Sequence, residues 1–173
     1  SLDFGGDDSY RAADDALCSF GAGVFGVGVL WDGGGNDRYE AQRRTQGAAF
    51  FGVGVLIDTA GDDTYTAVQG SQGSATAGYA VLIDRTGNDR YESFLESQAF
   101  AGPNAAAVLI DLAGDDHYLA NDTDIRFPSA QNPQHNNSLC QGAGTGWRAD
   151  YVDGVSVNGG VAILVDAAGD DEY

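Results

Sequence analysis

The chain has no lysine and no methionine, and only two cysteines, two histidines and three prolines occur among its 173 residues. All eight basic residues are arginines, against 26 acidic residues, so the formal net charge is −18. A surface this acidic repels nucleic acid and anionic membranes, and we expect neither as a partner. No run of 18 apolar residues is present either, so we expect no membrane insertion.

The common catalytic motifs are also missing. The sequence contains no phosphate-binding loop and no HExxH, GxSxG or CxxC motif. Its histidines, His117 and His135, stand apart from each other and are typical of surface positions. We therefore expect that the chain is not an enzyme.

What the sequence does contain is a repeat. The motif D-x-x-G-[ND]-D-x-Y occurs six times, and its first aspartates are separated by 29, 26, 26, 27 and 55 residues. An apolar run such as GVGVLID (52–58) ends on each later first aspartate, and a signal such as QGSA (72–75) lies between most copies. The first aspartates are Asp3, Asp32, Asp58, Asp84, Asp111 and Asp166. Three signals in a constant order predict a repeat architecture.

A unit of about 26 residues cannot bury its own apolar face, but stacked copies can. The glycine-rich corners and β-branched runs favour strands over helices. We therefore predict an all-β chain that forms one domain over 1–173, a right-handed parallel β-solenoid of about five coils. The expected coils are 3–31, 32–57, 58–83, 84–110 and 111–173, with insertions at about 119–140 and 147–159.

The apolar runs have two apolar faces. Alternate residues of a strand point to the same face, and one of the two faces has a leucine in every copy, as in Leu56 and Leu82. We assign this face to the core. A strand that is apolar on both faces is normally covered on both, so we expect a partner subunit or an inserted segment over the second stripe. This partner-facing stripe consists of Val29, Trp31, Val55, Ile57, Val81, Ile83, Val108 and Ile110.

Stacking also aligns the acidic corners. Coils repeat at about 4.8 Å, so the aspartates form a column in which neighbours repel by about 1 kcal/mol even in water. Carboxylates at a glycine corner are ligands that Ca²⁺ prefers, and a bound cation would neutralise the column. The predicted calcium ligands are Asp8, Asp32, Asp37, Asp58, Asp63, Asp84, Asp89, Asp111, Asp116, Asp166 and Asp171.

The segment GGGNDRYE (33–40) resembles the haemolysin-type (RTX) calcium-binding repeat, through Gly33, Gly34, Gly35, Asp37 and Tyr39. The resemblance implies that glycine carbonyls and the aspartates of adjacent coils hold Ca²⁺, in a protein that is extracellular, at the cell surface or periplasmic. By position, the family's aspartate corresponds to Asp8, Asp37, Asp63, Asp89, Asp116 and Asp171. The family repeats every nine residues and has two calcium turns per coil, whereas the longer period here gives one, and most copies lack the doubled glycine.

A metal-free corner is the alternative. Asparagine and aspartate side chains can bond the local backbone, and stacked copies can bond one another. Asn36 and Asn88 stand where other copies have aspartate, and an amide is a poorer ligand than a carboxylate. The sequence leaves both possibilities open.

The two cysteines lie about four coils apart, Cys18 in the first and Cys140 in the fifth. That separation is about 19 Å, beyond the reach of a disulfide. We therefore expect no intramolecular bridge. End-to-end stacking of two copies would bring Cys140 near Cys18 of the next copy, which makes them candidates for an intermolecular disulfide.

These patterns predict a calcium-binding structural module, secreted or surface-exposed, such as a scaffold, an adhesin or a subunit of a filament or complex. It would associate with itself or with a protein partner through its ends or its second apolar face. The alternative is a carbohydrate-active enzyme or carbohydrate-binding module whose glycan site lies on the insertions (119–159). The charged residues gathered there are Asp122, Asp124, Arg126, Arg148, Asp150 and Asp153.

Overall fold

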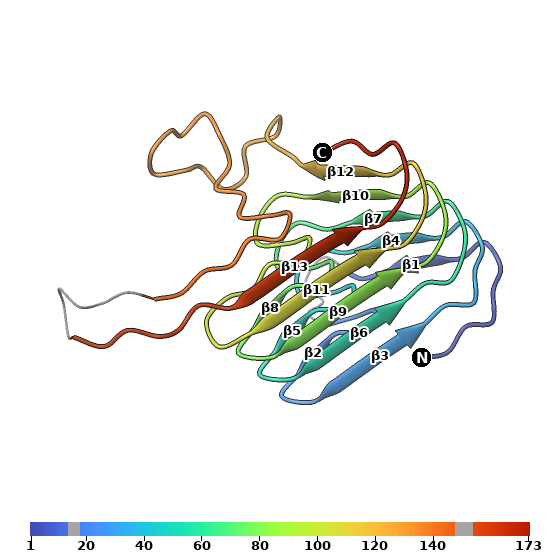
Figure 1. The fold of residues 1–173 in the computed structure, drawn as a ribbon, viewed down its shortest axis with the longest axis horizontal. Coiled ribbons are helices and arrows are strands. Elements are labelled where there is room, and N and C mark those ends of the chain that lie inside the picture. Colours follow the sequence, from blue (N-terminus) through green and yellow to red (C-terminus); the bar gives the residue numbers. More distant parts are fainter. Residues whose placement is uncertain (14–17, 148–153) are drawn as a thin grey trace.

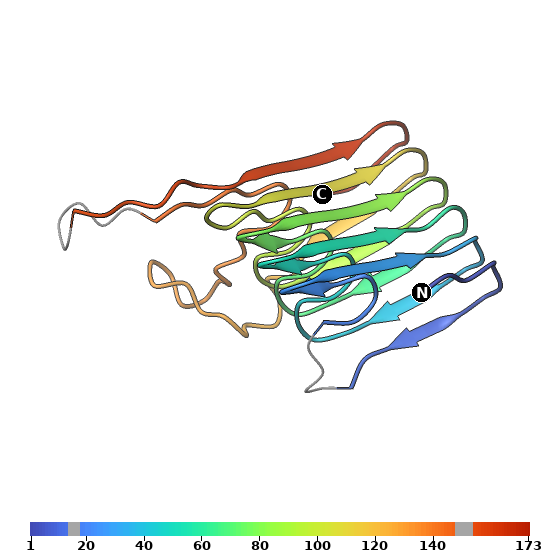
Figure 2. The same ribbon diagram turned by 90° about the horizontal axis from the view of Figure 1, so that it is seen from below.

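The structure is a computed structural model that describes residues 1–13, 18–147 and 154–173. The predicted all-β architecture is confirmed: the chain winds into a parallel β-solenoid, with successive coils stacked side by side (Figures 1 and 2). None of the described residues belongs to a helix that could cross a membrane.

The coils build three parallel sheets, two of five strands and one of three strands. The long-strand sheet contains the apolar runs: β3 (Val27–Trp31), β6 (Val53–Ile57), β9 (Tyr79–Asp84), β11 (Ala106–Asp111) and β13 (Val161–Asp166). The tyrosine sheet follows the acidic corner: β1 (Ser9–Arg11), β4 (Arg38–Glu40), β7 (Thr64–Thr66), β10 (Arg90–Ser93) and β12 (His117–Ala120). The short sheet contains β2 (Gly23–Val24), β5 (Ala49–Phe50) and β8 (Ala75–Thr76).

Pairing between coils follows the sequence repeat without slippage. Leu56 pairs with Leu82 across β6 and β9, and Tyr65 pairs with Tyr91 across β7 and β10. Equivalent side chains therefore stack in columns, because a strand that is apolar on its inner face fixes its register strongly.

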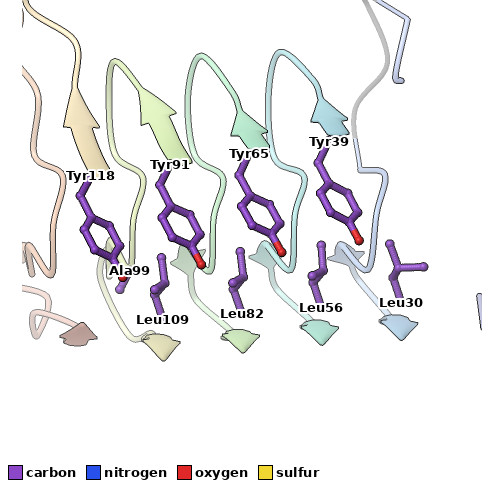
Figure 3. Packing of buried hydrophobic residues seen from close by; sticks show 9 residues of the cluster. All are labelled: Leu30, Tyr39, Leu56, Tyr65, Leu82, Tyr91, Ala99, Leu109 and Tyr118. Atoms are coloured by element: carbon purple, nitrogen blue, oxygen red, sulfur yellow. The ribbon is translucent and has the colours of Figure 1, made fainter. Parts of the chain in front are cut away.

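Leucines and tyrosines fill the interior from opposite sheets (Figure 3). The leucines of β3, β6, β9 and β11 are at most 2% exposed, and Leu164 of β13 packs against them at the end of the stack. The tyrosine rings are stacked at 4.7–4.9 Å between centroids, from Tyr10 through the successive copies to Tyr173. The tyrosines thus form a continuous aromatic column, and ring stacking adds to the stabilisation that their burial gives.

The glutamines of the QGSA-type signal link successive coils through the backbone. The amide of Gln72 donates to two backbone carbonyls, Tyr65 O at 2.9 Å and Glu92 O at 3.0 Å, and Gln46 and Gln98 do the same one coil away. Each glutamine therefore ties its own coil to the next through the backbone; all three have a left-handed φ of 52–55° and are fully buried.

The inserted segments project beside the solenoid (Figures 1 and 2). In the first, an antiparallel bridge joins Pro128 to Asn136; in the second, another joins Trp147 to Val157, on either side of the undescribed residues 148–153. Their described parts do not lie over the outer face of the long-strand sheet. That correction leaves the second apolar stripe without the intramolecular cover that we considered.

Candidate metal centre

Two aspartates per coil form a column inside the corner that joins the long-strand sheet to the tyrosine sheet. The strand-end aspartates close the apolar strands, and the corner aspartates follow them by five residues. The strand-end aspartates are Asp32, Asp58, Asp84, Asp111 and Asp166. The corner aspartates are Asp8, Asp37, Asp63, Asp89, Asp116 and Asp171. We call the two sets together the aspartate column; its eight members from Asp32 to Asp116 are at most 2% exposed.

In four of the five strand-end aspartates, one oxygen accepts from a tyrosine hydroxyl of the preceding coil, whereas Asp166 Oδ2 accepts from Tyr173 at 3.2 Å. Tyr39 donates to Asp58 Oδ2 at 2.6 Å, and Tyr65 donates to Asp84 Oδ2 at 2.7 Å. The other oxygen, Oδ1, is buried and has no hydrogen-bond partner among the described residues in Asp58, Asp84, Asp111 and Asp166. The tyrosine hydroxyls thus hold these carboxyl groups and leave one oxygen of each of these last four without a partner in the described part of the chain, whereas Asp32 Oδ1 accepts from the N–H of Gly34 at 3.0 Å.

One oxygen of each corner aspartate binds the backbone instead. The N–H of Asp37 donates to Asp63 Oδ1 at 2.6 Å, and the N–H of Asp63 donates to Asp89 Oδ1 at 2.7 Å. The Oδ2 atoms of Asp37, Asp63, Asp89 and Asp116 are buried and have no partner within the described part of the chain. From Asp58 to Asp116, aspartates of both kinds therefore have one buried oxygen without a hydrogen-bond partner among the described residues.

These carboxyl groups come together in five triads whose ligand oxygens lie within 4.8 Å of one another. The structure brings all eleven predicted ligands into these triads. It adds Asp3, which could have been found from its place as the first aspartate of the first motif copy. The triads are Asp3/Asp8/Asp32, Asp32/Asp37/Asp58, Asp58/Asp63/Asp84, Asp89/Asp111/Asp116 and Asp116/Asp166/Asp171.

Burial makes the charged form of these groups costly. Burial first, and the neighbouring carboxylates with it, raise the pKa of Asp63 to about 8 and those of Asp84 and Asp116 to about 7. Two carboxylates 4 Å apart repel by about 4 kcal/mol at an effective dielectric constant of 20. The column is therefore stable only if protons or cations neutralise part of its charge.

The arginines do not provide that charge. Among the described residues, every ion pair joins an arginine or histidine to an acid outside the column, such as Arg38 to Glu40 and Arg90 to Glu92. The set of available ligands is all oxygen, which suits a hard cation. The aspartate clusters could thus hold a metal ion, and without one the facing oxygens can share protons.

The exposed second position of the motif gives a further set of bonds between coils. Asn36 Oδ1 accepts from the N–H of Asp62 at 3.0 Å, and Asp62 Oδ1 accepts from the N–H of Asn88 at 2.8 Å. Asparagine and aspartate act alike here because only one acceptor oxygen is used. The backbone-bonded corner considered as the alternative is therefore present at this outer position, beside the unsatisfied inner oxygens.

The tyrosine hydroxyls are the part of the site that sequence reasoning missed. The available signal was the tyrosine that ends every copy of the motif D-x-x-G-[ND]-D-x-Y, seven residues after the first aspartate. We expect Tyr65→Phe to lower the free energy of unfolding by about 1–3 kcal/mol, because Asp84 Oδ2 loses its buried donor. Tyr79→Phe is the control: this ring is 66% exposed, and its loss of a hydroxyl should change stability by less than about 0.5 kcal/mol in urea unfolding. Equal effects of the two changes would contradict the role given to the hydroxyl.

The cysteines are free, and burial raises the pKa of both thiols. Cys140 Sγ lies 3.6 Å from Ser93 Oγ and 3.3 Å from the carbonyl oxygen of Ser138. The absence of an intramolecular bridge agrees with the predicted register, and the intermolecular disulfide stays a prediction.

The charged residues of the first insertion are engaged within their own loop. Arg126 pairs with Asp124 at 2.7 Å and lies over the ring of Phe94, while Asp122 contacts His135 and accepts from the N–H of Asn136. Asn136 is 8% exposed, and its side chain forms hydrogen bonds with four backbone groups of the loop. These bonds hold the two halves of the loop together. Arg148, Asp150 and Asp153 lie outside the described residues.

Comparison of the chain with protein-family models, with curated proteins and with solved structures finds no match. The assignment of function therefore rests on the geometry of the solenoid and its aspartate column.

Proposed function

We propose that this chain is a calcium-stabilised structural module that serves in assembly at the cell surface, in the periplasm or outside the cell. One observation carries the proposal: from Asp58 to Asp116, each buried aspartate of the column has one oxygen without a hydrogen-bond partner among the described residues, and these carboxyl groups gather in triads within 4.8 Å. Buried polar groups are normally paired, so a repeated set of unpaired oxygens points to a bound group.

Calcium fits this set better than other common cations. The column offers carboxylate oxygens only, with no histidine or cysteine in the triads, which does not favour zinc or copper. Magnesium usually keeps several waters and demands near-octahedral geometry, which suits a buried site poorly. Calcium accepts irregular shells that include carboxylates and backbone carbonyls, as the resemblance to haemolysin-type repeats also implies. A calcium-dependent fold would suit a calcium-rich, extracellular setting.

A structural role is supported by where the acids lie. A catalytic carboxyl group must touch its substrate, whereas those of the inner coils are almost fully buried and recur in every coil. The glycan alternative receives no comparable support, since the described charges of the first insertion are satisfied within the loop.

The direct test is thermal unfolding after removal of metal by a chelator, and again after calcium is restored. Calcium at 1,000 times its Kd adds about 4 kcal/mol per site, which corresponds to a rise in Tm of about 8–16 °C for a chain of this size. Elemental analysis of the protein gives the number of bound ions. An unchanged Tm together with no bound calcium would overturn the proposal.

Asp63→Asn and Asp62→Asn form a matched pair for this test. Position 62 is equivalent to Asn36 and Asn88, so Asp62→Asn should keep the calcium response. Asp63→Asn replaces a buried ligand by an amide that can donate to the free oxygen of a strand-end aspartate. We expect this variant to be more stable than the native chain without metal at pH 8 and to gain less from calcium. Identical calcium responses of the two variants would show that the inner oxygens are not the site.

A further inference from the structure

The outer face of the long-strand sheet carries no charged side chain. Its fifteen outward residues form three columns over five strands, one column more than the sequence indicated. The first column is Val27, Val53, Tyr79, Ala106 and Val161. The second is Val29, Val55, Val81, Val108 and Ile163. The third is Trp31, Ile57, Ile83, Ile110 and Val165. We call this surface the apolar face.

The tyrosine sheet shows that this composition is not a general property of the solenoid. Its outer face carries Arg38, Glu40, Arg90 and Glu92 and is typical of a sheet that meets water. On the apolar face Val27 is 75% exposed, Tyr79 66% and Val161 61%, and its centre is half-buried only by neighbouring side chains. Exposed apolar surfaces of this extent mark interfaces.

We propose that the apolar face binds the same face of a second copy of this chain, to give a two-fold dimer in which the two sheets stack. The inference deepens the proposed assembly role and rests on it. Six of the fifteen side chains are at least 39% exposed in the single chain, and a stable interface buries about 800 Å² on each partner, which a face of five strands can supply. A sheet with regular columns is complementary to its own copy, because the inner faces of stacked sheets interdigitate at a spacing of about 10 Å.

The charge distribution selects one orientation of the dimer. The aspartate column and the exposed acids Asp62 and Asp115 lie along one edge of the apolar face, where its strands end. If the strands of the two copies ran parallel across the interface, these acidic edges would adjoin. If they run antiparallel, with the solenoid axes parallel, the acidic edges lie on opposite sides of the dimer. Repulsion between like charges therefore favours the antiparallel arrangement.

The first experiment measures mass by sedimentation equilibrium in calcium-containing buffer. The native chain should have twice its monomer mass of 17.9 kDa. Val81→Asp places a charge at the centre of the apolar face and should give a monomer. Thr64→Asp is the control; it adds the same charge on the outside of the tyrosine sheet, between Arg38 and Arg90, and should remain a dimer. A native monomer at high concentration, or a Val81→Asp dimer, would overturn the proposal.

A second variant with smaller changes distinguishes loss of the dimer from loss of folding. Val55→Thr, Val81→Thr and Val108→Thr in one chain keep the shape and β propensity of the central column and should weaken the dimer at least tenfold. Calcium-dependent unfolding is measured on the same samples. A lost dimer with an intact calcium response would match the inference, whereas a dimer without a calcium response would contradict the proposed metal role and leave the interface standing.

The orientation is tested in a chain whose native cysteines are changed to serine. Tyr79→Cys belongs to the first column and Ile83→Cys to the third, which face each other only in the antiparallel dimer. With a thiol cross-linker of about 10 Å, the spacing of stacked sheets, a mixture of the two variants should cross-link better than either variant alone. Better cross-linking within each variant would overturn this orientation.

Discussion

Replacing Gly61 with alanine is expected to cost more than about 4 kcal/mol or to prevent folding. A Cβ atom at this position would lie 1.5 Å from the carbonyl oxygen of Gly35, and the backbone has a φ of +142°. The same clash recurs in the next coils. A Cβ atom added at Gly87 would lie 1.6 Å from Gly61 O, and one added at Gly114 would lie 1.5 Å from Gly87 O. Because the obstructing atom belongs to the backbone, the clash can be relieved only by opening the spacing between two coils that are paired along three sheets.

Gly26→Ala is the control for this change. Its Cβ would come no closer than 3.7 Å to Val24 O, so stability should change by less than about 1 kcal/mol. Urea unfolding followed by circular dichroism measures both variants. If Gly61→Ala behaved like Gly26→Ala, the close stacking of the corner glycines would be wrong.

Without metal, the chain should be markedly more stable at pH 5 than at pH 8. Burial raises the pKa of Asp84 and Asp116 to about 7 and that of Asp63 to about 8, whereas an unfolded aspartate has a pKa near 3.9. The folded state therefore retains protons that the unfolded chain has released. The stabilisation is complete below about pH 4 and is lost as the pH rises through 7 to 8.

Saturating calcium should remove most of this dependence, because the cation takes the place of the shared protons. Calcium binding near pH 7 should then release protons, which titration calorimetry in buffers of different ionisation enthalpy detects. The Tm is measured between pH 5 and pH 8 in metal-free and calcium-loaded samples. A metal-free Tm that stays level or rises over this range would contradict the raised pKa values of the column.

The charge of the column connects stability, metal binding and assembly. The apolar strands favour stacking of coils, but the same stacking brings the carboxyl groups together and opposes it. If a bound cation neutralises the column, the stability of the fold depends on the cation concentration and the pH around the protein. In the proposed dimer, the second apolar stripe is buried against its copy while the acidic edges remain apart.

The amino-acid sequence by itself determined the repeat, the solenoid, the leucine core and the grouping of the aspartates. A constant spacing of the apolar runs, the acidic corners and the glutamines leaves parallel in-register stacking as the arrangement that buries every leucine at once. Stacking in register then brings the aspartates together, whatever their detailed geometry. The eleven predicted ligands followed from this one-dimensional pattern.

Only the tertiary structure decided which carboxyl oxygens are free. Asp58 gives one oxygen to Tyr39 of the coil before it, and Asp63 gives one to the backbone of Asp37. Such bonds depend on the distance and rotation between coils, which a sequence period does not specify. The same reason explains why Gln72 bonds backbone carbonyls rather than other glutamines, and why the inserted segments leave the apolar face uncovered. Periodicity fixes which residues are neighbours, and packing fixes which of their atoms meet.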